Sequence, residues 1–209
     1  MRLESSNKST NELAVVPHKF GQIRYNATDR IIIPSTTSVR RNYIPIGFVE
    51  SEIIISNLAY YIPASKLYLF GVINSRCHVL WIKTIAGKLK SDYRYTSGLC
   101  YNTFPFPPIS QARKEELVTH TFRILEEREK HPEKTLAQLY DPDKMPDGLR
   151  EAHRLNDLAV ERCYRSKPFE SDEERLEYLS KLYEKMIQEE KDRETLFQKE
   201  KKSRKKKKK

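Results

Sequence analysis

The chain has 209 residues, which is long enough for one or two compact domains. Hydrophobic residues make up 38% and charged residues 33%, and no window offers the roughly 20 apolar residues that a membrane-spanning helix needs. The three cysteines are odd in number and far apart, which excludes a disulfide framework and a structural zinc site. The first residues lack the apolar stretch of a secretory signal, so we expect a cytoplasmic protein without a membrane partner.

The net charge of +10 is divided unevenly along the chain. Residues 1–108 carry 13 Lys and Arg against 6 Asp and Glu, residues 109–198 carry 17 against 22, and residues 199–209 carry 9 against 1. Fourteen of the 21 aromatic residues also lie in residues 1–108. The chain is therefore a basic, aromatic-rich half, an acidic half and a short basic tail, and not a uniformly basic polyanion binder.

The basic half predicts short strands and one helix. Residues 30–34 and 52–56 each hold three consecutive isoleucines between polar or helix-breaking residues, and this pattern predicts two short buried strands. From Ser65 onward apolar residues recur three and four positions apart, which predicts one amphipathic helix of about five turns that ends at Gly87. The Phe-Pro-Phe-Pro-Pro run at 104–108 is a stiff connector that no helix can cross, so we place a domain boundary there.

The acidic half predicts helices, and its capping residues mark where they begin. We expect four helices to start at or just after Ser110, Thr135, Asp147 and Ser171. Like charges at the density of the Lys-rich tail repel one another, so we expect that segment to be disordered. The resulting division is an N-terminal extension (1–16), a recognition domain (17–108), a helical domain (109–198) and the tail (199–209).

These elements predict an α+β fold. It would consist of a mixed, mainly antiparallel sheet domain with one long helix, followed by a small all-α domain and a disordered basic tail.

Motifs of common catalytic sites are absent from the sequence. It contains no GxGxxG, GxxxxGK[ST] or GxSxG, and no Asp/Asn-Pro-Pro-Tyr/Phe motif of amino-methyltransferases. A nuclease motif could be assembled only from residues 146–147 and 189–191, which lie in or beside separate helices, whereas a Mg²⁺ site needs its carboxylates gathered together. His153 and Asp157 lie four positions apart on one predicted helix without an evident third ligand, so we interpret them as structural. We therefore expect no catalytic residue, metal site or cofactor in this chain.

One segment combines the residue types that nucleic-acid binding requires. Between residues 74 and 96 the chain interleaves cations with aromatic residues, namely Arg76, Lys83, Lys88, Lys90 and Arg94 with Trp81, Tyr93 and Tyr95. Cations contact phosphates, and Arg or Lys side chains also reach base edges. If the chain is extended around Leu89, Lys88 and Lys90 point to the same side. The hydroxyl-rich stretch around Arg40 and Arg41 is also suited to phosphate oxygens. The alternative is a solvated basic face with buried tyrosines.

Several runs of residues resemble the C-terminal part of one family of enzymes, in the same order. The runs are Tyr68-Leu-Phe-Gly, Asn74-Ser-Arg, Gly87-Lys-Leu-Lys-Ser-Asp-Tyr-Arg-Tyr, Tyr101-Asn-Thr-Phe-Pro-Phe-Pro, Leu136-Ala-Gln-Leu-Tyr-Asp-Pro, Met145-Pro and Ser171-Asp-Glu-Glu-Arg-Leu. They are similar to the target recognition domain and C-terminal helical domain of MmeI-like type IIG restriction–modification enzymes and related adenine-specific DNA methyltransferases. The similarity covers roughly residues 17–190, outside which lies the Lys-rich tail.

The resemblance implies a sequence-specific module for double-stranded DNA in a prokaryotic cytoplasm. In the family, the positions flanking the Leu of the Gly-x-Leu-x segment help to choose the base pair, and here they are Lys88 and Lys90. Together with the basic segments, it suggests a set of residues that contact or position the DNA backbone: Arg40, Arg41, Arg76, Lys83, Ser91, Arg94 and Tyr95.

The resemblance also implies what lies elsewhere. Methyltransferase domains, and in some members a nuclease, would lie upstream or on a separate chain and would bind S-adenosylmethionine and Mg²⁺. This chain alone would then be no enzyme. The main alternative is a non-catalytic adaptor that docks a partner through its acidic helices and binds nucleic acid non-specifically through its tail. A gene remnant without activity is a further alternative.

Overall fold

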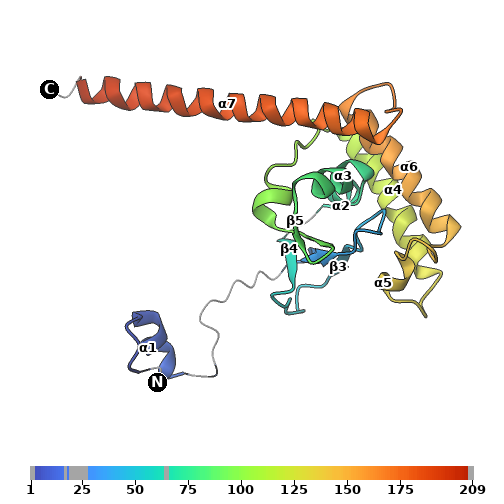
Figure 1. Ribbon diagram of the computed structural model, residues 1–209, viewed down its shortest axis with the longest axis horizontal. Coiled ribbons are helices and arrows are strands. Elements are labelled where there is room, and N and C mark those ends of the chain that lie inside the picture. The colour runs from blue at the N-terminus through green and yellow to red at the C-terminus, as the bar shows by residue number, and fades with distance from the viewer. Residues whose placement is uncertain (1–2, 17, 19–27, 64–65, 207–209) are drawn as a thin grey trace.

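The computed structural model describes residues 3–16, 18, 28–63 and 66–206, with side chains up to residue 193. The helices are α1 (Lys8–Ala14), α2 (Leu67–Ile73), α3 (Arg76–Ile85), α4 (Gln111–Glu129), α5 (Leu136–Leu139), α6 (Asp147–Tyr164) and α7 (Asp172–Lys206). The strands are β1 (Arg30–Pro34), β2 (Thr36–Thr37), β3 (Gly47–Val49), β4 (Ala59–Pro63), β5 (Gly87–Leu89) and β6 (Asp92–Arg94). A short π-helical turn, Ser97–Tyr101, follows β6. Figure 1 shows the strands gathered beside the α4–α6 pair, with α7 projecting from it.

Two small antiparallel sheets lie in the basic half. One has the order β3-β1-β4 and the other β2-β6-β5. β1 and β2 are separated by Ser35 alone, so the chain passes directly from the first sheet into the second. In the second sheet Thr36 lies opposite Arg94, and Arg94 lies opposite Gly87. The predicted α+β class, with helices following the sheets, is confirmed.

The predicted strand at residues 52–56 is wrong, because these residues form the loop between β3 and β4. Both edges of β1 are already paired, one with β3 and the other with β4, so no edge of this central strand is left for the isoleucines. Ile53 and Ile54 are 48% and 77% exposed. The buried Arg30 side chain holds the start of the loop by donating to the backbone carbonyls of Glu50 and Ser51.

The single long helix is also wrong, because the structure divides it into α2 and α3. The break is at Asn74 and Ser75, where Ser75 adopts an extended backbone and its hydroxyl accepts the first-turn N–H of His78. The apolar spacing continues through the break, which is why the periodicity could not show it. The predicted cap Ser65 lies outside the described residues, and Gly87 begins β5 directly after α3 ends.

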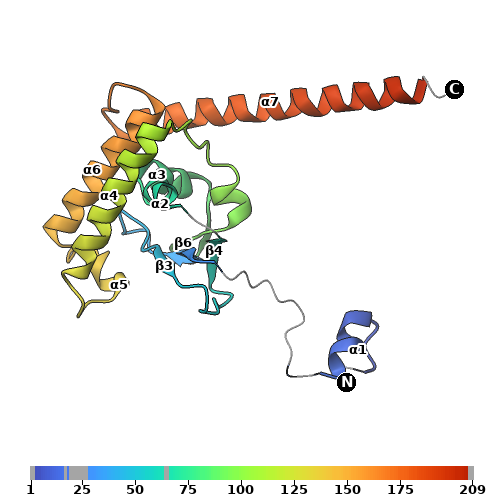
Figure 2. The same ribbon diagram turned by 180° about the vertical axis from the view of Figure 1, so that it is seen from behind.

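The predicted starts of the C-terminal helices are confirmed. The hydroxyl of Ser110 accepts the N–H of Arg113, and Thr135 forms a reciprocal capping box with Gln138. Ser171 accepts the N–H of Glu174 at 3.2 Å. Figures 1 and 2 show α4 and α6 lying side by side.

The two halves share their interior. One apolar cluster joins β1 and α2 to α4 and α6, with Ile31, Phe70, Ile124 and Leu149 among its buried members. A second cluster joins α3 to α4, α6 and α7, with Trp81, Phe104, Leu117, Ala159 and Leu179 among its buried members. Because both clusters draw on both halves, the strands and helices of the body are stabilised together.

The last helix is longer than predicted. α7 continues to Lys206 and includes residues 199–206, for which the sequence predicted disorder. Lys and Arg are good helix formers, and cations near a helix C-terminus interact favourably with its dipole. Among the described residues, no helix is both long and apolar enough to cross a membrane.

Candidate nucleic-acid interface

The β5–β6 hairpin brings four of the predicted DNA-contacting residues together. Lys88, Lys90, Ser91 and Arg94 are all exposed on these two strands and the turn between them. Leu89 and Asp92 are cross-strand partners, so Lys90 and Ser91 form a two-residue turn. Lys90 has a φ of 58°, a left-handed conformation that is uncommon for a residue other than glycine. A strained residue at an exposed tip, where glycine would fit more easily, is a feature found at functional sites.

The two lysines occupy different positions on this hairpin. β5 ends at Leu89, so Lys90 is not on the extended strand and the prediction that alternation places both side chains on one side does not apply. The ammonium group of Lys88 lies over the ring of Tyr93, 5.9 Å from its centroid. Among the described residues, neither lysine forms an ion pair, and the same is true of Arg94. All three cations are therefore available to a polyanion.

Tyr95 is the predicted contact residue that the structure removes from the surface. Only 1% of it is exposed, and its ring packs near those of Tyr60 and His78. Burial raises the pKa of its hydroxyl well above its ordinary range. Its backbone N–H donates to the carbonyl of Ser35 at 2.9 Å, which ties the end of β6 to the link between the two sheets. Tyr95 supports the hairpin from inside, and its side chain is not accessible at the surface in this conformation.

Arg40 and Arg41 follow β2 and face the helical half. The guanidinium of Arg40 forms an exposed ion pair with Asp143, in the turn between α5 and α6. Arg41 donates to the carbonyl of Ala137 in α5 at 3.4 Å. β2 pairs with β6 of the hairpin, but Arg40 and Arg41 lie in the turn and loop that follow β2, and their partners are in the helical half.

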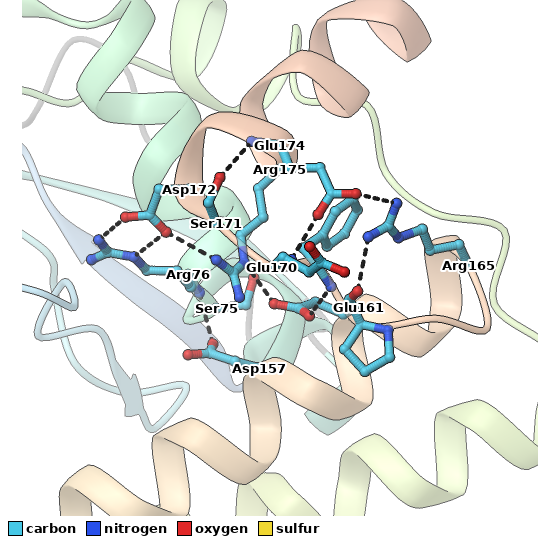
Figure 3. Close-up of polar contacts among 12 residues, drawn as sticks. Ser75, Arg76, Asp157, Glu161, Arg165, Glu170, Ser171, Asp172, Glu174 and Arg175 are labelled. Carbon is cyan, nitrogen blue, oxygen red and sulfur yellow. Dashed lines mark hydrogen bonds and ion pairs between the residues drawn. The ribbon is translucent and has the colours of Figure 1, made fainter.

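Arg76 begins α3, and Lys83 lies in the last turn of the same helix. The guanidinium of Arg76 donates to both carboxylate oxygens of Asp172, and its backbone N–H donates to Asp157 at 2.7 Å (Figure 3). The hydrogen bond to Asp172 raises the pKa of Arg76. Burial lowers the pKa of Lys83, and nearby Arg76 lowers it further. The structure therefore uses the charge of Arg76 to hold α3 against α7.

Sequence reasoning missed the ion-pair junction to which Arg76 belongs. We call the contacts among Arg76, Asp157, Glu161, Asp172 and Arg175 the α3–α6–α7 junction (Figure 3). Glu161 is 1% exposed, accepts from Arg175 at 2.7 Å and also accepts the N–H of Phe169. The acidic first turn of α7 is explained by the helix dipole alone, so nothing in the sequence identified Arg76 as a partner of this turn.

His153 and Asp157 are structural, as expected from the sequence, but they bind other partners and not each other. The buried His153 ring lies 2.7 Å from the hydroxyl of Tyr140, and Asp157 accepts from the hydroxyl of Tyr43 at 2.6 Å. Burial raises the pKa of Asp157 from 3.8 to about 7, although the hydrogen bonds from Tyr43 and Arg76 act in the opposite direction. Asp157 thus links the loop after β2, the start of α3 and the middle of α6.

A cleft of about 640 Å³ lies beside this junction. It is lined by Asn42, Tyr43, Arg76, Asp147, Arg150, Glu151, Arg154, Asp157 and Arg175. Most of its charges are already matched: Arg154, for example, donates twice to Glu151. The described residues contain no group of three His, Cys, Asp or Glu placed to hold a metal ion. Compared with this cleft, the hairpin is the better candidate for a nucleic-acid interface.

Known proteins match most of this arrangement. The family model for the MmeI target recognition domain matches residues 1–108, and the model for the MmeI C-terminal domain matches residues 109–189. The chain belongs to the MmeI family. The two MmeI models meet at the end of the proline-rich connector, and the resemblance inferred from the sequence is confirmed.

Two relatives show how much of a longer protein this chain covers. DNA methyltransferase A of Bacillus subtilis (strain 168) is 48% identical over 187 residues, which are 90% of this chain and 21% of that protein. The structure of the type IIL restriction–modification enzyme MmeI in complex with DNA matches with a TM-score of 0.82 and 39% identity. The match covers 90% of the present chain and 25% of the MmeI chain. The chain therefore spans between a fifth and a quarter of these relatives.

Proposed function

We propose that this chain reads the sequence of double-stranded DNA for an MmeI-like enzyme of the type IIG, adenine-specific kind. The observation that carries the proposal is that Lys88, Lys90, Ser91 and Arg94 stand together, exposed, on one hairpin. The comparisons support it, because the hairpin lies in the part of the chain that matches a target recognition domain and because MmeI has been solved with DNA.

The hairpin has the shape and chemistry that base reading requires. A two-stranded ribbon fits into the major groove of B-DNA, where lysine can donate to the O6 and N7 acceptors of guanine. In the proposal Lys90 reaches a base edge from the turn and Lys88 does so from β5. Each good contact would contribute about 1–3 kcal/mol of discrimination against the wrong base. Arg94 and Ser91 contact phosphates, which fix the register without carrying sequence information.

The other predicted contacts take modified roles in the proposal. Arg40 can leave Asp143 for a phosphate at little cost, because exposed ion pairs contribute only about 0–1 kcal/mol. In the proposal Arg41 and Lys83 add to the positive field around the duplex. Arg76 acts as a structural residue within the α3–α6–α7 junction.

Catalysis belongs, in this proposal, to sequence outside these 209 residues. Three quarters or more of each relative lies beyond the matched segment. A methyltransferase domain there would bind S-adenosylmethionine, and a nuclease, where present, would bind Mg²⁺. The hairpin would select the site and the catalytic domains would act on it.

The proposal is tested by selecting binding sequences from a pool of random duplexes with the purified chain. We expect one sequence to be enriched, Lys88→Ala or Lys90→Ala to relax the preference at individual positions, and Arg94→Ala to weaken binding to all sequences alike. Lys181→Ala is the matched control, since this exposed lysine lies on α7 and pairs with Glu177. Recovery of no preferred sequence, or equal losses for all three hairpin variants, would contradict the proposal.

A further inference from the structure

The second half of α7 stands outside the packed body. Leu179 is buried in the second apolar cluster, and Leu176 and Tyr183 pack against it. From Gln188 to Arg193 every described side chain is exposed. Figures 1 and 2 show that the helix continues well beyond the body.

Local side-chain pairs stabilise this solvated helix. Lys181 bonds Glu177 at 2.6 Å, Lys185 lies 3.9 Å from Glu189, and the side-chain amide of Gln188 donates to Asp192 at 2.9 Å, all at i,i+4 spacing. Such pairs favour a helix that has no packing partner. The projecting segment is therefore suited to act as a semi-rigid spacer.

Charge changes sign along α7 and the residues after it. Residues 172–194 carry five Lys and Arg against nine Asp and Glu, whereas residues 199–209 carry nine against one. The acidic part would be repelled by phosphates and the basic end attracted to them. The MmeI C-terminal model ends at residue 189, so the match to the family does not include this basic end.

We propose that the basic end of α7, residues 199–206, is a second, sequence-independent binding site for the phosphodiester backbone of duplex DNA, held away from the body by the preceding turns of α7. A helix rises about 1.5 Å per residue, so Lys199 lies about 18 Å beyond Ile187. Base pairs are spaced about 3.4 Å apart, so this reach corresponds to about 5 base pairs of flanking duplex, and more towards the end of the helix. The site would add affinity by raising the local concentration of the hairpin near DNA.

The first experiment measures how binding to a duplex of arbitrary sequence, about 30 base pairs long, depends on salt. Each phosphate neutralised contributes about 0.9 to the slope of log affinity against log salt, so loss of about five contacts reduces the slope by about 4–5. We expect this reduction in a chain that ends at Gln198 and in one whose nine tail cations are replaced by glutamine. A tail of identical composition in scrambled order is the control and should bind like the original. An unchanged slope in both variants would overturn the inference.

The second experiment tests the spacer. An insertion of Glu-Ala-Ala-Ala-Lys-Ala-Ala after Ile187 adds no net charge and lengthens the helix by about 10 Å. In duplexes that carry the selected sequence, the flank length at which affinity stops rising should grow by about 3 base pairs. An unchanged flank length would show that α7 does not set the reach. Vesicles containing phosphatidylserine are the competing ligand, and tail-dependent binding to them in preference to duplex DNA would also contradict the proposal.

These outcomes separate the tail from the hairpin. A truncated chain that keeps its sequence preference but loses salt dependence supports both proposals. Tail-dependent binding without any sequence preference supports the tail site and contradicts sequence reading by the hairpin. Sequence preference with no contribution from the tail supports sequence reading by the hairpin and contradicts the tail site.

Discussion

The β5–β6 hairpin and the α3–α6–α7 junction use the same kinds of residue for opposite purposes. In the hairpin, Lys90 and Arg94 are exposed, and neither has a carboxylate partner among the described residues. In the junction, Arg76 and Arg175 are largely enclosed and bonded to carboxylates. The role of a cation in a basic segment therefore depends on its partners. An unpaired cation can attract phosphates, whereas a paired cation fixes the relative positions of helices.

The largest effect should come from the junction. Arg175→Met leaves the carboxylate of Glu161 buried without its cation, and breaking a buried ion pair costs about 3–5 kcal/mol. Because Arg175 retains some exposure, we expect the free energy of unfolding to fall by about 3 kcal/mol, measured by urea denaturation. Arg154→Met, at an exposed pair on α6, is the control and should have little effect. If the two variants lost equal stability, the junction would have no special structural role.

The next effect concerns the hairpin and should leave stability intact. Lys90→Ala should reduce discrimination between the preferred base and its competitors by about 1–3 kcal/mol in a competition assay with matched duplexes. Its urea denaturation curve should coincide with that of the original chain, because the side chain of Lys90 is exposed. A change in stability without a change in base preference would show that Lys90, like the residues of the junction, has a structural role.

Asp157 should make stability depend on pH. Its pKa rises from 3.8 to about 7 on folding, so the folded chain binds a proton that the unfolded chain releases. This contribution is fully present below about pH 4 and is lost as pH rises through 7. Its charged and titratable neighbours are Tyr43, Arg76, Glu161 and Arg175.

The corresponding variant is Asp157→Asn, which keeps the shape of the side chain and cannot titrate. We expect it to flatten the dependence of the unfolding free energy on pH between about 4 and 7. The measurement is urea denaturation at several pH values. A variant with the same pH profile as the original chain would assign the dependence to another group.

The smallest effect concerns the strain at the hairpin tip. Lys90→Gly relieves the left-handed conformation, at some cost in chain entropy, and should raise the free energy of unfolding by roughly 0.5–1 kcal/mol. The same variant should lose base discrimination, which Lys90→Ala would lose without gaining stability. A destabilised glycine variant would show that Lys90 stabilises the turn through its side chain.

Features that depend on residues close together in the sequence could be predicted, whereas features that depend on residues far apart in the sequence could not. Ser110, Thr135 and Ser171 were recognisable as caps because each acts on residues three positions away. The isoleucines at 52–56 have the composition of a strand, but only the pairing of β1 on both sides determines that they form a loop.

For the candidate site, the Gly-x-Leu-x segment that resembles MmeI-like enzymes predicted Lys88 and Lys90 as base-reading residues, and the structure places both on one hairpin. The sequence did not predict the turn itself, since Lys90-Ser91 contains neither glycine nor asparagine. The role of Arg76 depends on Asp172, which lies 96 positions further along the chain. No local pattern could have indicated that partner.

The shared interior has a consequence for protein engineering. Phe104, the first residue of the connector, packs in one cluster with Leu117 and Leu179, which follow the connector. A transplant that cut the chain at residue 108 would expose apolar surface on both products. Anyone who wishes to transfer the proposed specificity to a relative should therefore exchange the segment from the first strand through the packed part of α7 as one cassette.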